Sequence, residues 1–250
     1  MSEQTISAQR RIRLCFSKGG AMRYISHLDL LRAFQRVMRR AKLPVAYSQG
    51  FNPHILLSFA LPLPLGMESA RDYADLALTG GEEISPEEIV SRLNENAPGG
   101  LRFLGARMLG SGEARAAAIV AAADYALRLP VSSEEDSRAI STVLDALLAE
   151  PTLVTLKKTK SGEKETDIRR DILRLSYETG PEPQIILRLS ASSARFLNPE
   201  TVAGLIFERL QRESVGRFLR LDLYREVGGK RVPLMEEIPA GAAAAPGETP

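Results

Sequence analysis

The sequence predicts an α+β protein built from two successive βαββαβ units with antiparallel sheets. Three observations support this prediction. Short segments alternate apolar and charged residues, as half-buried strands do, and longer segments repeat apolar residues at helical spacing. The order strand, helix, strand, strand, helix, strand occurs twice along the chain. This order is typical of the ferredoxin-like fold, so two tandem ferredoxin-like domains are expected.

The first strand is expected at residues 11–16, where three apolar residues alternate with Arg11, Arg13 and Cys15. Successive side chains of a strand point to opposite faces of its sheet. Because the apolar residues face the helices, the two arginines and Cys15 are expected on the open face of the sheet.

The first helix is expected at residues 27–42. Ser26 followed by Asp29 gives a capping signal, apolar residues then recur at helical spacing, and Pro44 ends the pattern. Its other face carries four arginines: Arg32, Arg36, Arg39 and Arg40.

The remaining elements follow in the same way. Strands are expected at residues 54–66, 71–80 and 101–109, and a helix from Pro86 to Asn96 after the cap Ser85. In the second domain, helices are expected at 133–150 and 198–212, with Asn198 as cap, and strands at 124–130, 153–160, 171–178, 183–190 and 217–226. One of these strands exceeds the βαββαβ pattern. The expected domains are residues 10–109 and 124–228, joined by a linker at 110–123, with a disordered tail at 236–250.

Composition limits the classes of protein to consider. The chain has 250 residues, 44% of them hydrophobic and 26% charged, as in a globular protein. It has no apolar run of about 20 residues and no signal peptide, so a cytoplasmic protein away from membranes is expected. The single Cys15 cannot form an internal disulfide or hold an iron–sulfur cluster alone. Phosphate-loop, HExxH and nucleophile-elbow motifs are absent, so an enzyme of a common class is not expected.

Charge is concentrated near the N-terminus. Residues 10–67 hold ten Lys or Arg against one acid, Asp29, a local charge of +9 in a chain whose total is +2. An ordinary solvated helix face mixes both signs, whereas this segment does not. The pattern favours a surface for a polyanion such as nucleic acid. The residues expected to contribute are Arg11, Arg13, Arg23, Arg32, Arg36, Arg39 and Arg40.

The segment YSQGFNPH, residues 47–54, follows this basic helix. Gly50 permits a positive φ and Asn52–Pro53 favours a turn. Aromatic, amide and imidazole groups suit stacking on RNA bases and hydrogen bonding to them, so Tyr47, Gln49, Asn52 and His54 are candidate base contacts. The competing interpretation is structural: Tyr47 and Phe51 pack into the core, and His54 begins a strand.

A second basic segment covers residues 156–172. Lys157, Lys158 and Lys160 are candidate nucleic-acid contacts, and with the first basic region they predict a composite groove. The alternative is a charged hairpin with its tip at Ser161–Gly162.

The two histidines allow a catalytic interpretation. His27, helped by Tyr24, Ser26 or Lys18, could cleave RNA without a metal by acid–base catalysis. His27, His54 and Asp29 could hold a metal, but their spacing matches no metal motif, so no metal site is predicted. A structural or RNA-contacting role is the competing interpretation for both histidines.

The phrases SHLD (26–29), YSQGFNPH (47–54) and PLPLGMES (62–69), with KKTKSGEKETDIRR (157–170), closely resemble a family of radical SAM-associated (radical SAM-linked) domains of unknown function, here in a stand-alone form. The resemblance covers residues 11–226. It implies partnership with a radical SAM enzyme that uses S-adenosylmethionine, an iron–sulfur cluster and cobalamin, and a role in RNA or ribosome metabolism. A radical SAM cluster needs three cysteine ligands, so those cofactors would belong to another chain.

The sequence therefore predicts a non-catalytic, RNA-binding accessory protein that presents RNA to a separate radical SAM enzyme. One alternative is a metal-independent RNA endonuclease, similar in topology to the tandem ferredoxin-like CRISPR-processing nucleases, with His27 and Tyr24 as catalytic residues. Another is a protein–protein adaptor whose basic face meets an acidic partner.

Overall fold

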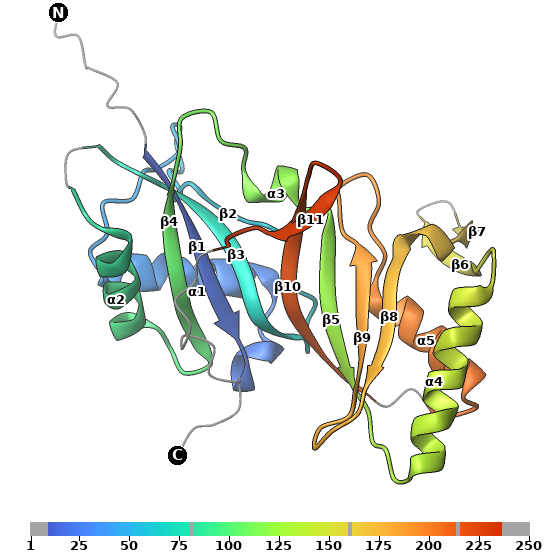
Figure 1. Ribbon diagram of the computed structural model, residues 1–250. Coiled ribbons are helices and arrows are strands. Elements are labelled where there is room, and N and C mark those ends of the chain that lie inside the picture. Colours follow the sequence, from blue (N-terminus) through green and yellow to red (C-terminus); the bar gives the residue numbers. More distant parts are fainter. Residues whose placement is uncertain (1–9, 81–82, 160–161, 214–215, 237–250) are drawn as a thin grey trace, which may run out of the picture. The chain divides into compact units, whose positions relative to one another are not determined.

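The protein is α+β, and in the computed structural model its chain forms two compact units (Figure 1). The structure describes residues 10–80, 83–159, 162–213 and 216–236. The first unit contains residues up to Val120 and those from Arg225 onward, and the second contains Ala121–Tyr224. The expected linker at 110–123 thus belongs mostly to the first unit and carries the short helix α3 (Ala116–Ile119). Apart from Glu236, the expected tail at 236–250 lies outside the described residues.

The first unit has a sheet with the strand order β4–β1–β3–β2, in which each pair of neighbours is antiparallel. Two helices, α1 and α2, pack on one face of this sheet (Figure 1). The bounds are β1 Arg10–Lys18, α1 His27–Arg40, β2 Leu57–Phe59, β3 Glu68–Leu78, α2 Pro86–Asn96 and β4 Leu101–Leu109. The strand expected at residues 54–66 is therefore much shorter than predicted.

Helix α1 forms for the reasons that the sequence indicates. The Ser26 hydroxyl accepts a hydrogen bond from the Asp29 backbone N–H at 3.2 Å and caps the helix. The apolar face is buried, and Phe34 packs edge-to-face against Phe16 of β1 with ring centroids 4.8 Å apart. The helix ends at Arg40, two residues earlier than expected, and Lys42 has a positive φ of 51°.

The second face of this sheet is covered, which corrects the prediction that Arg13 and Cys15 lie on an open face. Both side chains are fully buried. The segment before α3 and the C-terminal segment contact Arg13: its Nη2 donates to Ala114 O at 3.0 Å, and its Nη1 donates to Leu234 O at 3.5 Å. Alternation along β1 shows which side each residue faces, but not what packs on that side.

The second unit has the strand order β10–β5–β9–β8, and its neighbouring strands are also antiparallel. A separate hairpin of β6 and β7 follows α4, so the expected extra strand is one arm of a hairpin. The bounds are β5 Ala122–Arg128, α4 Glu134–Ala149, β6 Val154–Thr159, β7 Gly162–Asp167, β8 Ile172–Glu178, β9 Gln184–Ser190, α5 Pro199–Arg209, β10 Arg217–Val227 and β11 Lys230–Pro233. Residues 225–227 and β11 fall in the first unit.

Two further helices begin at the caps that the sequence predicts. Ser85 Oγ accepts from the Glu88 N–H at 3.1 Å, and Asn198 Oδ1 accepts from the Glu200 N–H at 3.1 Å. A proline follows each cap, where its missing N–H costs no helical hydrogen bond. None of the described helices combines the length and the apolar character needed to cross a membrane.

Candidate nucleic-acid interface

Four arginines form an exposed row on α1, which we call the cationic helix surface: Arg32, Arg36, Arg39 and Arg40. Arg32 is partly neutralised, because its Nη1 lies 2.9 Å from Asp29 Oδ1. Hydrogen bonds from Ser26 and then Arg32 lower the pKa of Asp29. Among the described residues, none of the ion pairs involves the other three arginines. Three guanidinium groups are thus exposed without a carboxylate at ion-pair distance, although Arg36 also helps to lower the pKa of Asp29.

Their spacing places these three charges together. Residues three and four apart lie on the same side of a helix, so Arg36 is next to both Arg39 and Arg40. The last two are in the final turn of α1, where the partial negative charge of the helix end favours cations. The exposed Lys42 follows directly and extends the positive region.

The segment Tyr47–His54, which we call the recognition loop, is a tight loop rather than the start of a strand. Its neck is closed by Ser48 and His54: Ser48 N–H donates to His54 O at 2.8 Å, and His54 N–H donates to Ser48 Oγ at 3.1 Å. A β-bridge between Tyr47 and Ile55 continues the closure. Gly50, at φ 124°, makes a turn that a residue with a side chain rarely adopts.

The tip of the recognition loop exposes an aromatic residue that the structural interpretation of this segment expected in the core. Phe51 is fully exposed, which makes that interpretation wrong for Phe51, and Tyr47 is 39% exposed. Gln49, Asn52 and His54 are exposed as well. An exposed phenylalanine contributes nothing to a core, so Phe51 joins the candidate base contacts. Its position between Gly50 and Asn52, inside a turn, is the signal that could have identified it.

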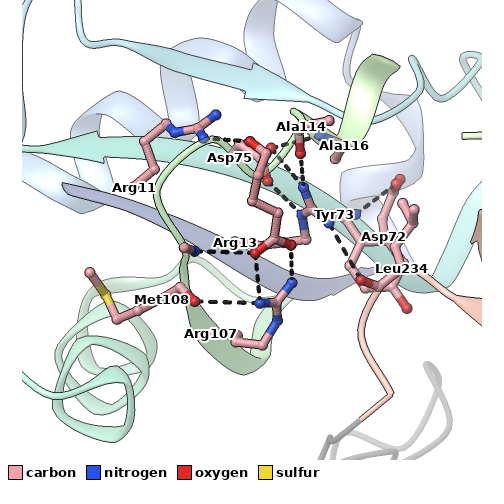
Figure 2. Close-up of polar contacts among 12 residues, drawn as sticks. Arg11, Arg13, Asp72, Tyr73, Asp75, Arg107, Met108, Ala114, Ala116 and Leu234 are labelled. Atoms are coloured by element: carbon pink, nitrogen blue, oxygen red, sulfur yellow. Dashed lines mark hydrogen bonds and ion pairs between the residues drawn. The ribbon is translucent and has the colours of Figure 1, made fainter. Parts of the chain in front are cut away.

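Arg13 cannot contact RNA, which corrects its assignment as a nucleic-acid ligand. Its Nε lies 2.8 Å from Asp75 Oδ1 and its Nη2 lies 3.1 Å from Oδ2, so the two side chains form a buried, two-point ion pair (Figure 2). Asp75 also accepts a hydrogen bond from Ala116 N–H at 2.7 Å. The pair holds β1, β3 and the α3 segment together.

A second ion pair lies beside the first. Arg107, labelled in Figure 2, has its Nη1 3.0 Å from Glu113 Oε2, and this oxygen also accepts from Gly110 N–H at 3.2 Å. The hydrogen bond from Arg107 is the main reason that the pKa of Glu113 falls to about 2. Arg11 is half-buried nearby, and its Nη2 donates to the backbone oxygen of Glu113.

Arg11 and His54 meet at a small pocket in the first unit. The pocket has a volume of about 210 Å³ and includes Arg115, Ser58 and Asp75 in its wall. The other lining residues come from the adjoining parts of the chain: Ile55, Leu56, Leu57, Leu76 and Ala77. Arg115 was not predicted as a site residue, because the composition of residues 110–123 indicates a linker.

Arg23 lies elsewhere, in the short 3₁₀ helix Gly20–Tyr24. Its guanidinium carbon is 4.6 Å from the centre of the Tyr24 ring, and it also donates to the Tyr24 hydroxyl. Arg23 Nη1 is 4.0 Å from Glu68 Oε1, so its charge is partly balanced.

The alternative catalytic residues do not form a dyad. The His27 ring packs edge-to-face against Phe59, with centroids 5.3 Å apart. In the described part of the chain, no hydrogen bond joins His27 to Tyr24, and Lys18 is buried. The described residues also contain no cluster of three or more His, Cys, Asp or Glu suited to a metal ion.

The second basic segment forms the β6–β7 hairpin of the second unit. The register pairs Lys157 with Lys164 and Lys158 with Glu163. This observation agrees with the alternative of a charged hairpin. Lys160 lies outside the described residues, and the composite groove stays a prediction.

Together, fold and site define an α+β protein with two small sheet units, the first of which presents a cationic helix surface and an exposed loop. The chain belongs to the family described as "Uncharacterized protein conserved in bacteria (DUF2344)", whose sequence model matches residues 11–199. The matched region thus includes the cationic helix surface and the recognition loop.

Other comparisons add little. No curated protein matches the chain. A solved structure described as "Crystal Structure of an Unknown Protein from Galdieria sulphuraria" is 11% identical and covers 88% of this chain and 99% of its own. Its TM-score is 0.26, which is too low to support a statement about fold or function.

Proposed function

We propose that this protein binds single-stranded RNA as a non-catalytic accessory protein, using the cationic helix surface and the recognition loop. One observation carries the proposal. Arg36, Arg39 and Arg40 are exposed without carboxylate partners at the end of α1, and the chain then leads within a few residues to a loop whose tip exposes Phe51.

Single-stranded RNA suits this combination of groups. Guanidinium groups bind phosphates, and an exposed aromatic ring stacks on an unpaired base at about 1–3 kcal/mol per base. The exposed amides of Gln49 and Asn52 can hydrogen-bond base edges, which a duplex would leave out of reach. Paired RNA hides its base faces, so the exposed ring favours unpaired strands.

We also propose that each unit is ferredoxin-like. The strand orders β4–β1–β3–β2 and β10–β5–β9–β8, with a helix after the first and third strands of each, support this assignment. In the second unit the β6–β7 hairpin is then an insertion between the first helix and the second strand.

The proposed partner is a radical SAM enzyme in the cytoplasm. This part of the proposal is supported by the resemblance of the SHLD, YSQGFNPH and PLPLGMES phrases to radical SAM-linked domains. S-adenosylmethionine, the iron–sulfur cluster and cobalamin would be bound by that enzyme, since this chain has one cysteine. RNA held on the first unit would be presented to it.

The direct test is binding of a fluorescent single-stranded RNA of about 12 nucleotides, a length within the usual site sizes of such proteins. Arg36→Gln with Arg39→Gln removes two phosphate contacts, and we expect affinity to fall about tenfold or more in fluorescence anisotropy. Arg92→Gln with Arg102→Gln, on α2 and β4, removes the same charge elsewhere and should change affinity little.

Equal affinity of the wild type and the Arg36→Gln, Arg39→Gln variant would rule out the cationic helix surface as the RNA site. If a purified radical SAM partner bound the protein after nuclease treatment but lost binding in this variant, the surface would instead serve a protein–protein adaptor.

A further inference from the structure

The pocket between β2, β3 and the start of β1 has a partly polar wall, and of its polar residues only Asp75 belongs to an ion pair among the described residues. Arg11 comes from β1, Arg115 from the turn before α3, and His54 from the end of the recognition loop. Residues from three distant parts of the sequence, two arginines and one histidine, thus line a single recess of about 210 Å³.

The charge of this recess is positive. Asp75 is its one acidic lining residue, and Arg13 neutralises that carboxylate through two contacts of 2.8 and 3.1 Å from the buried side. The nearby carboxylate of Glu113 is bound by Arg107. In the described part of the chain, the ion pairs leave out both Arg11 and Arg115. Two positive charges therefore remain for a ligand.

Arg11 is held in place. Its Nη2 donates to the backbone oxygen of Glu113, which fixes the guanidinium while leaving other N–H groups of the same side chain. Such a preorganised guanidinium loses less freedom when it binds an anion than a mobile surface arginine does.

The His54 ring is also fixed by a neighbour. Ser48 Oγ lies 2.8 Å from His54 Nδ1 and accepts the His54 backbone N–H at 3.1 Å. The contact between Ser48 Oγ and Nδ1 restrains the orientation of the His54 ring at the edge of the pocket. His54 therefore belongs both to the neck of the recognition loop and to the pocket wall.

The volume decides what size of anion fits. Pockets for drug-sized ligands usually measure about 300–1,000 Å³. A recess of about 210 Å³ admits a phosphate group with part of its sugar, and excludes a longer stretch of nucleic acid.

We propose that this pocket binds a phosphomonoester, in the form of the terminal phosphate of the RNA strand held on the cationic helix surface. This inference rests on the proposed function for its source of phosphate. Arg11 and Arg115 provide the charge, through charge-assisted hydrogen bonds to the phosphate oxygens. The recognition loop joins the terminal phosphate site to the base contacts through His54.

The test compares a 5′-phosphorylated RNA of about 12 nucleotides with the same RNA carrying a 5′-hydroxyl, by fluorescence anisotropy, and adds AMP as a free phosphomonoester in calorimetry. The wild type should prefer the phosphorylated strand about tenfold. Arg11→Gln with Arg115→Gln should abolish the preference, and Arg92→Gln with Arg102→Gln should retain it. Arg115→Gln alone changes only an exposed side chain and tests the pocket without disturbing the hydrogen bond of Arg11.

The possible results separate the pocket from the RNA surface. AMP binding that is lost in Arg115→Gln, without a preference between the two RNAs, would overturn the RNA terminus as the occupant and leave a phosphomonoester site for a free nucleotide. The proposal is overturned if the wild type shows no preference between the RNAs and no AMP binding that depends on Arg11 or Arg115. Binding of the 5′-hydroxyl RNA depends on Arg36 and Arg39 rather than on the pocket. If the wild type did not bind this RNA, the proposed function would be contradicted. The AMP measurement would still show whether the pocket binds a phosphomonoester.

Discussion

Arg13 of β1 and Asp75 of β3 lie directly opposite each other in the sheet and form a buried two-point ion pair. Asp75 also fixes the start of α3 through Ala116 N–H. The pair therefore connects two strands to the segment that carries Arg115, one wall of the proposed phosphate pocket. Arg13, which the sequence suggests as an RNA contact, instead stabilises the first unit.

Replacing Arg13 tests this structural role. Arg13→Met leaves the Asp75 carboxylate buried without its main partner, and breaking a buried pair in this way costs about 3–5 kcal/mol. We expect the urea midpoint of unfolding to fall accordingly. The exposed Arg102→Met should change the free energy of unfolding by less than about 0.5 kcal/mol. Equal midpoints for the two variants would show that Arg13 is not structural.

The ion pair of Glu113 with Arg107 should make the stability of the first unit sensitive to acid. The hydrogen bond from Arg107 is the largest of the causes that lower the folded pKa of Glu113 from 4.5 to about 2, so the ionised carboxylate stabilises the fold above about pH 4.5, and this contribution is lost as the pH falls toward 2. Glu113→Gln has no charge to lose and should show a flatter decline of stability in this interval. Thermal unfolding between pH 5 and pH 2 measures it. The exposed Glu208→Gln serves as the control, and a decline for Glu113→Gln as steep as that for Glu208→Gln would contradict the assignment.

Replacing Phe51 should change RNA binding without changing the stability of the protein. Because its side chain is fully exposed, Phe51→Ala should leave the melting temperature unchanged. Loss of one stacked base should weaken RNA binding by about 1–3 kcal/mol, roughly 5- to 150-fold. Phe196→Ala, at a 44% exposed aromatic in the second unit, is the matched control and should bind RNA as the wild type does. Normal affinity in Phe51→Ala would remove the recognition loop from the interface.

Incubation of RNA with the protein in EDTA distinguishes binding from cleavage. His27 packs against Phe59, and the structure provides it with no hydrogen bond to Tyr24, so we expect the RNA to remain intact. Gel electrophoresis of the RNA is the readout. Cleavage that disappears in His27→Ala would establish the endonuclease alternative.

Local signals in the sequence predict most of the elements but not what covers them. Ser26, Ser85 and Asn198 are caps whose side chains bond the nearby backbone, so the helix starts follow from a few neighbouring residues. Arg13 was misplaced because the backbone groups that contact it, Ala114 O and Leu234 O, lie far away in the sequence. Arg115 was missed because the small residues of 110–123 indicate a linker, and its place beside Arg11 and His54 depends on the folded chain.

In the candidate site, too, some features could be predicted from the sequence and others could not. The exposed row on α1 follows from helical periodicity alone, and the structure places Arg36, Arg39 and Arg40 as that periodicity predicts. The exposure of Phe51 depends on how Ser48 and His54 close the loop, a geometry that composition does not reveal. Prediction thus failed for Arg13 at contacts between distant segments, and for Phe51 at the three-dimensional closure of a short loop.

The salt dependence of RNA binding is the sharpest test of the cationic helix surface as an RNA site. Each phosphate contact on a single strand contributes about 0.7 to the slope of log affinity against log salt concentration. We predict a steep slope for the wild type and a slope smaller by about 1.4 for Arg36→Gln with Arg39→Gln. Identical slopes for the two proteins would contradict this prediction, since the cationic helix surface would then make no phosphate contacts.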